Sequence, residues 1–201
     1  MLDGPVGRLE ALLEEPEQGE PLACALVCHP HPQHGGTMHT RVVYRTARAL
    51  RNAGAAVLRF HYRGVNLSEG QYDHGNGEID DGRACLTWLR ARYPNLPFAI
   101  SGFSFGSRIA LKLAVDSPEA TKVIAIGYPT KYPDPAYIST IRIPKVFIQS
   151  THDEFGPKPD LEALYATFPE PKSIHWIESK DHFFVDGLDA FEETVRVTGA
   201  L

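Results

Sequence analysis

The sequence predicts an α/β fold with a mostly parallel central sheet and helices on both faces. A continuous apolar run of strand length at residues 22–28 is typical of a strand buried on both faces, and residues 55–60 are predicted as the next buried strand. Stretches with helical spacing of apolar residues separate these runs. Strands that alternate with helices in this way favour a parallel sheet, and functional residues are expected in the loops at its carboxyl edge.

Length and composition are those of a soluble globular protein, and we expect a single domain over residues 1–201. The formal net charge of −5 gives no general attraction to nucleic acid. The N-terminus lacks the pattern of a signal peptide, and no run approaches roughly 18 apolar residues. We therefore expect a cytoplasmic protein that binds neither nucleic acid nor a membrane.

The three cysteines are expected to be free thiols. Cys24 and Cys28 lie on one predicted strand, where their Cα atoms would be roughly 13 Å apart, whereas a disulfide needs less than about 7 Å. Cys85 falls in a predicted helix. Three thiols without a framework spacing favour a reducing compartment.

The elements follow in order along the chain. Residues 6–15 are predicted as a first strand, although their mixture of Leu and Glu also suits a helix. After residues 22–28 and 55–60, further strands are predicted at residues 98–100, 122–126, 145–149 and 173–177. Helices are predicted at residues 39–53, around 79–89, and at 109–114, 157–168 and 187–197. A long loop is expected over residues 61–77.

The stretch Gly102-Phe103-Ser104-Phe105-Gly106 joins a predicted strand to a predicted helix. A serine at the centre of G-x-S-x-G in this context is typical of a nucleophile elbow. The strained turn needs small residues two positions before and after the serine, and both are glycine. The stretch predicts Ser104 as a nucleophile and the backbone amide of Phe105, at the start of the helix, as an oxyanion donor.

Asp153 and His182 complete a candidate catalytic triad with Ser104. Asp153 follows the strand predicted at residues 145–149, and His182 follows the strand predicted at 173–177. Their order along the chain, Ser then Asp then His, is the one expected in this architecture. We expect His182 to accept the Ser104 proton and Asp153 to fix the tautomer of His182.

Other polar residues near these positions fit the roles less well. Glu154 is one step further from its strand, and Asp160 falls at a helix start, where an acid favours the helix dipole. Asp181 is adjacent to His182 and is expected to point elsewhere. His152 and His175 are weaker candidates for the base, since His175 lies within a strand. Two serines that flank the elbow are expected to be structural: Ser101 and Ser107.

Three motifs give the chain its resemblance to a known family. They are the HPHP…GGTM loop at residues 29–38, the stretch from Arg59 to Gly64, and the GFSFG elbow. With these motifs the sequence resembles the α/β-hydrolase superfamily, and specifically a small, lidless subgroup of serine hydrolases, over most of residues 22–195. The resemblance implies Asp153 and His182 at the acid and base positions. The connection over residues 127–144 is too short for a helical lid.

The resemblance also implies a second oxyanion amide in the loop after residue 28. Proline has no amide hydrogen, so Pro30 and Pro32 cannot serve. His31 is the predicted donor, with Gln33 as the alternative.

Several side chains near the predicted site have both a functional and a structural interpretation. Tyr128 and Phe183 are predicted to line the substrate pocket, together with Pro129 and Phe105, although each would also suit an aromatic core. His29 is expected to brace its loop through a hydrogen bond. Residues 59–63 include Arg59, His61, Tyr62 and Arg63, which could hold an anionic group. We favour a structural role there, in which Arg63 links loops.

The predicted function is that of an esterase-like serine hydrolase. It would cleave a small-molecule acyl ester or thioester through an acyl-enzyme on Ser104, without a metal or an organic cofactor. A first alternative is a non-catalytic scaffold of the same fold that binds a protein partner. Free edge strands could also pair two chains as a homodimer.

A second alternative is a metal-dependent hydrolase that uses the histidine-rich loop. The histidines concerned are His29, His31, His34 and His39. This alternative is disfavoured because His-Pro pairs stiffen the backbone, and because no cysteine or carboxylate cluster with ligand spacing accompanies the imidazoles.

Overall fold

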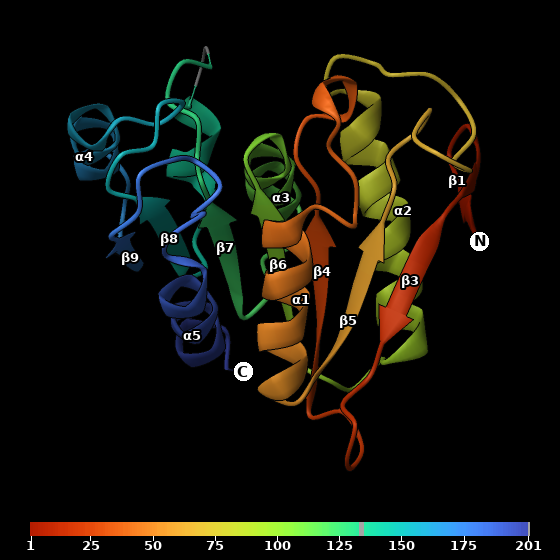
Figure 1. Cartoon of the computed structure of the whole chain (residues 1–201). Coiled ribbons are helices and arrows are strands. Elements are labelled where there is room, and N and C mark those ends of the chain that lie inside the picture. The colour runs from red at the N-terminus through yellow and green to blue at the C-terminus, as the bar shows by residue number, and fades with distance from the viewer. Residues whose placement is uncertain (133–134, 201) are drawn as a thin grey trace.

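A computed structural model describes residues 1–132 and 135–200 of the chain. In this part of the protein the main sheet has seven strands in the order β3-β5-β4-β6-β7-β8-β9 (Figure 1). Its strands are β3 (Ala11–Glu14), β4 (Ala23–Cys28), β5 (Ala55–Phe60), β6 (Phe98–Phe103), β7 (Lys122–Ile126), β8 (Lys145–Ser150) and β9 (Lys172–Ile177). β3 is antiparallel to β5, and all other neighbours in this sheet are parallel. The predicted α/β fold with a mostly parallel sheet is confirmed.

Helices cover both faces of the sheet, which explains why every residue of β4, β5, β6 and β8 is buried. α1 (Arg41–Asn52) and α5 (Leu188–Gly199) lie in front of the sheet in Figure 1, and α2 (Gly77–Arg92) lies behind it. α3 (Phe105–Val115) packs on the same face as α2. Successive residues of β4 alternate between the two cores, with Leu26 on the α2–α3 side and Val27 on the α1–α5 side. Each core therefore receives alternate side chains of the same strand.

The N-terminal segment forms strands, as one of the two interpretations of residues 6–15 predicted. β2 (Gly7–Leu9) pairs with β1 (Leu2–Gly4) in a small separate hairpin, and β3 pairs only with β5. The helical interpretation is wrong. β3 is an edge strand in which two of four side chains contact the core, so its mixture of Leu and Glu reflects a half-exposed strand.

The connection between β7 and β8 contains a short 3₁₀ helix, η2 (Ala136–Thr140), and the remaining helix, α4 (Lys158–Ala166), follows β8. Residues 133–134, which belong to the connection predicted over residues 127–144, lie outside the described residues. Across the described ranges, no helix combines the length and apolar character needed to cross a bilayer.

Buried carboxylates hold the long loop that was predicted over residues 61–77. The Arg63 guanidinium donates to the fully buried Asp81, with 2.8 Å between Nη2 and Oδ1. The Glu78 carboxylate accepts hydrogen bonds from the amides of Asp73 and Gly75, at 2.8 and 2.7 Å. Arg63 thus links two segments, in agreement with the structural role favoured for it. Removing one partner of such a buried pair costs about 3–5 kcal/mol.

The three cysteines are buried free thiols, as expected. Burial raises the pKa of Cys24 to about 11 and that of Cys28 to about 12. Both thiols therefore stay protonated at neutral pH, and a protonated buried thiol is a poor nucleophile.

Candidate active site

Ser104 occupies a sharp turn between β6 and α3. Its backbone has φ 55° and ψ −122°, a region that residues other than glycine rarely adopt. A Cβ atom at Gly102 would lie 2.0 Å from the carbonyl oxygen of Gly106, and one at Gly106 would lie 2.3 Å from that of Cys28. Neither contact is tolerable, so the turn requires glycine at both positions. The chain has the strand, turn and helix that the G-x-S-x-G pattern predicts.

His182 follows β9, and its ring is hydrogen-bonded to Asp153, which follows β8. The distance from Nδ1 to Oδ2 is 2.7 Å, and each residue is 2% exposed. Because a carboxylate only accepts hydrogen bonds, Nδ1 donates and Nε2 is left with a free lone pair. Nε2 is buried and has no hydrogen-bond partner among the described residues.

The Asp153 carboxylate is fixed by further donors. Oδ1 accepts from the amides of Phe155 and Gly156, at 2.8 and 3.0 Å, and Oδ2 also accepts from Gln149 Nε2 at 2.9 Å. Gln149 Oε1 in turn accepts from the Tyr128 amide at 2.8 Å. Sequence reasoning missed Gln149, although an amide side chain in a buried strand needs hydrogen-bond partners, and that need was an available signal.

The other acids near His182 bind backbone groups. Glu154 Oε2 accepts from the His182 amide at 3.0 Å, and Asp181 Oδ1 accepts from the amides of Phe183 and Val185 at 3.1 Å. Asp160 lies in the first turn of α4, as expected. These contacts orient the chain around His182 but leave its ring to Asp153.

A cavity of about 530 Å³ lies above the elbow. Its lining residues are Pro30, His31, His34, Ser104, Pro129, Lys131, Tyr132, Phe155, His182 and Phe183. Ser104 and His182 thus border the same space, and so does Phe183, which was expected there. The lining does not include Tyr128, which was also expected there.

The assignment of Tyr128 to the pocket is corrected by its burial. Its side chain is 2% exposed and packs edge-on against Phe147, with ring centroids 6.0 Å apart. Its neighbour Pro129 lines the cavity instead. Tyr132 and Phe155, which sequence reasoning did not select, supply the remaining aromatic wall.

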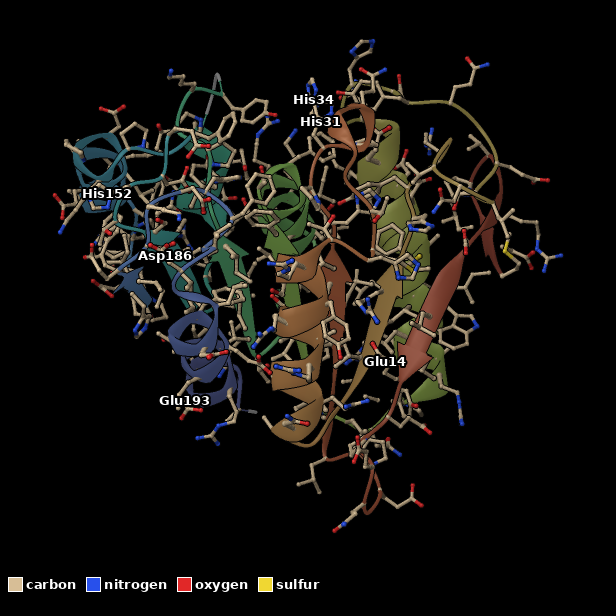
Figure 2. All side chains as sticks on the ribbon, viewed as in Figure 1. Glu14, His31, His34, His152, Asp186 and Glu193 are labelled. Atoms are coloured by element: carbon tan, nitrogen blue, oxygen red, sulfur yellow. The ribbon has the colours of Figure 1, made fainter. Side chains whose placement is uncertain are left out.

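His31 also lines the cavity and precedes the 3₁₀ helix η1 (Pro32–His34); Figure 2 labels His31 and His34 there. This loop follows β4, which lies on the other side of β6 from β7, β8 and β9. Its Nδ1 accepts a hydrogen bond from the Gln33 amide at 3.2 Å, so Nε2 carries the ring hydrogen and faces the Tyr72 hydroxyl at 3.1 Å. Burial lowers the pKa of His31, which favours this neutral form. The Gln33 amide is already engaged, and His31 therefore remains the better candidate for the second oxyanion donor.

The backbone amides of His31 and Phe105 have no acceptor within the described residues. Phe105 begins α3, and the first amides of a helix have no partner inside it. The Phe105 ring contacts His31, with centroids 5.0 Å apart. The loop after β4 and the start of α3 are therefore packed against each other at the cavity.

His29 braces the same loop from below, as expected. Its Nδ1 lies 2.7 Å from the carbonyl oxygen of Pro30, and its Nε2 accepts from the Tyr62 amide at 3.2 Å. Burial lowers the pKa of His29 to about 3. The ring is therefore neutral, with its hydrogen on Nδ1, and both nitrogens are satisfied.

Close packing holds the His182 ring. The ring centroids of Phe103 and Phe155 each lie 4.8 Å from that of His182. Behind the ring is Gly127, with φ 55°, where a Cβ atom would lie 2.9 Å from His182 Cε1. The imidazole thus occupies space that a side chain at position 127 would need.

The histidine-rich loop does not gather its rings around one point. Both ring nitrogens of His29 and of His31 have protein partners, and His39 packs against His61 with centroids 5.4 Å apart. Within residues 1–132 and 135–200, no group of three or more His, Cys, Asp or Glu residues is arranged to hold a metal ion.

Comparison with known proteins gives relatives along nearly the whole chain. A family model described as an alpha/beta hydrolase domain matches residues 24–190. An alpha-beta serine hydrolase homologue from Coxiella burnetii is similar in structure, with a TM-score of 0.92 and 33% identity, over 97% of this chain and 93% of that one.

Two further structures are similar. A serine hydrolase without a lid from Xanthomonas campestris has a TM-score of 0.90 and 34% identity, over 98% of this chain and 90% of that one. The esterase domain of a Rhodothermus marinus protein has a TM-score of 0.77 and 25% identity, over 99% of this chain and 94% of that one.

Proposed function

Because the chain belongs to the α/β-hydrolase family, we propose that this hydrolase is an esterase-like serine hydrolase. Its substrate would be a small acyl ester or thioester, cleaved through an acyl-enzyme on Ser104. One observation carries the proposal. The imidazole of His182 donates through Nδ1 to Asp153 and keeps Nε2 unpartnered among the described residues, beside the cavity that Ser104 lines.

The reaction would begin with proton transfer from Ser104 to His182. As Nε2 takes the hydroxyl proton, Oγ attacks the carbonyl carbon, and the carbonyl electron pair moves to oxygen. The backbone amides of Phe105 and His31 would donate to that oxyanion. His182 then returns the proton to the leaving group as the bond to it breaks.

Water completes the cycle by the same steps. His182 takes a proton from water, the hydroxide attacks the acyl carbon, and Ser104 leaves with the proton that His182 returns. Asp153 keeps Nδ1 protonated throughout, so that Nε2 is always the nitrogen that exchanges the proton. Gln149 supports this arrangement through its bond to Asp153.

The cavity supports a compact substrate. Phe155, Phe183 and Pro129 give it an apolar wall beside His182, and its volume of about 530 Å³ is that of a small-molecule site. The relatives without a lid support a site that is open to solvent. Specificity would then depend on contacts within the cavity and not on a closing cap.

The test is the loss of the nucleophile. Ser104→Ala should abolish hydrolysis of 4-nitrophenyl butanoate and labelling by a fluorophosphonate, because both need Oγ. Ser139→Ala, on the exposed helix η2, is the matched control and should keep both. Circular dichroism of each variant checks the fold.

Other outcomes distinguish the alternatives. Labelling that persists in Ser104→Ala would move the nucleophile to another residue. A wild-type protein that reacts with no serine-directed probe would favour the scaffold. Activity that is lost with a chelator and restored by zinc would favour the metal-dependent hydrolase.

A further inference from the structure

We propose that the cavity contains a subsite for an anionic group of the substrate, so that the preferred substrates are esters or thioesters bearing a carboxylate. This inference rests on the proposed function and narrows its substrate class. The subsite includes Lys131 and His34, which both line the cavity.

The charge of the lining is the first observation. The lining residues include a lysine and three histidines, and no aspartate or glutamate. Asp153 lies behind His182 and is bound by four donors. Lys131 is exposed and has no carboxylate partner within the described residues. On a chain whose formal net charge is −5, this cavity is therefore a locally basic site.

The second observation concerns which of these groups are free to bind. The ring nitrogens of His31 are engaged by Gln33 and Tyr72, and His182 serves Asp153 and Ser104. The ring of His34 packs on that of His31, with centroids 4.5 Å apart, and is exposed. Of the lysine and three histidines in the lining, Lys131 and His34 are thus the ones with hydrogen-bond donors that no described group engages.

The guanidinium of Arg108 lies behind Tyr132, which lines the same cavity. The guanidinium carbon of Arg108 lies 3.6 Å from the ring centroid of Tyr132, and Tyr132 lines the cavity next to Lys131. This cation–π contact holds a permanent positive charge close to the proposed subsite. An anion there would meet positive potential from both the lining and the layer beneath it.

Another part of the cavity lining is apolar. The rings of Phe155 and Phe183 lie beside His182, with centroids 4.8 and 5.4 Å from it, and Pro129 continues that surface. A substrate with a hydrocarbon portion at one end and a carboxylate at the other matches this division. A contact between an anion and an exposed lysine corresponds to roughly a 1.4-fold to fivefold preference in kcat/KM over a neutral analogue.

The experiment compares matched esters. For the acyl side, 4-nitrophenyl hydrogen adipate is compared with 4-nitrophenyl hexanoate. For the leaving-group side, the acetate ester of 4-hydroxyphenylacetate is compared with 4-ethylphenyl acetate. In at least one pair we expect the anionic ester to have the higher kcat/KM at low ionic strength. The ratio should fall toward one in 0.5 M salt, where the Debye length is only about 4 Å.

Two variants test the site. Lys131→Gln should bring the anionic-to-neutral ratio of that pair close to one. Lys158→Gln removes the same charge from the exposed face of α4, outside the cavity, and should leave the ratio as in the wild type.

Each failure has a distinct meaning. If the wild type hydrolyses neither neutral ester, the proposed function fails. If it hydrolyses neutral esters and neither ratio exceeds one, only the anionic subsite is overturned. A ratio that falls equally in Lys131→Gln and Lys158→Gln would also overturn the subsite, since it would show an effect of net charge alone.

Discussion

On one side of the cavity the His182 ring is held by a carboxylate, whereas on the other side the loop after β4 is held by neutral imidazoles. Asp153 accepts hydrogen bonds from two backbone amides, from Gln149 and from His182. His31, in contrast, sits between the Gln33 amide and the Tyr72 hydroxyl, and accepts from the first.

The carboxylate beside His182 and the imidazoles of the loop after β4 are therefore expected to respond differently to acid. Protonation of an imidazole turns its acceptor nitrogen into a donor, so a protonated His31 would direct an N–H toward the Gln33 amide. His29 would likewise direct an N–H toward the Tyr62 amide. Burial lowers the pKa of both rings, so both imidazoles stay neutral at neutral pH and their acceptor nitrogens keep these hydrogen bonds.

The largest effect on kcat is expected from a substitution of Asp153, the carboxylate that holds the His182 ring. Asp153→Asn can donate to Nδ1 and so favours the tautomer with the hydrogen on Nε2, which cannot accept the Ser104 proton. By analogy with the same change in a serine protease triad, kcat should fall by about 10⁴-fold. Steady-state hydrolysis of 4-nitrophenyl butanoate measures this.

Glu154→Gln is the control for that change, because Glu154 contacts the backbone amide of His182 and not its ring. We expect less than about a tenfold loss from it, since the replacement keeps an acceptor oxygen. An Asp153→Asn enzyme that keeps a tenth of the wild-type kcat would remove Asp153 from the mechanism.

A smaller effect should appear in stability against pH on the loop side. Burial lowers the pKa of His29 to about 3 in the folded protein, whereas an unfolded chain leaves it near the ordinary imidazole value of 6.5. The unfolded state therefore binds a proton first as the pH falls. The stability that neutral His29 contributes is complete above about pH 6.5 and is lost toward pH 3. At pH 4.5 this loss amounts to about 2–3 kcal/mol.

Urea unfolding at pH 7 and pH 4.5 measures that loss in the wild type and in His29→Asn. The variant should be less stable at pH 7, because two buried hydrogen bonds change, but its stability should depend less on pH. Equal pH dependence in the two proteins would show that another group causes the acid sensitivity.

The smallest effect should come from Tyr72→Phe. The change removes the hydroxyl that faces His31 Nε2 but keeps the ring contact with His31. A less firmly held His31 amide would stabilise the oxyanion less well, so kcat should fall roughly threefold to tenfold with little change in KM. Tyr44→Phe, on the exposed side of α1, is the control. A loss confined to KM would place Tyr72 in substrate binding instead.

The fold was largely predictable because its determinants are local. Residues 55–60 and 122–126 form strands with the predicted bounds, since strands buried on both faces are rich in apolar residues. The elbow was predictable for the same reason, because the steric demand on Gly102 and Gly106 arises within a few residues of Ser104.

The parts of the site that escaped prediction depend on orientation or on distant contacts. Tyr128 and Pro129 are adjacent, and only the backbone conformation decides which one faces the cavity. Tyr72 lies 41 residues from His31, in a loop whose path is set by Arg63 and Asp81. The role of Gln149 depends on its hydrogen bond to Asp153, which forms only when the loop after β8 folds back on the strand.

The glycine at position 127 shows how much can depend on a single hydrogen atom. Its Cα faces His182 at a distance where even alanine's methyl group would collide with the ring, and its φ of 55° adds a backbone penalty. A substitution there would force the His182 ring or the Phe103 ring to shift, although Gly127 itself takes no part in the proposed reaction. The position of the His182 ring therefore depends on Gly127, a residue that has no side chain of its own.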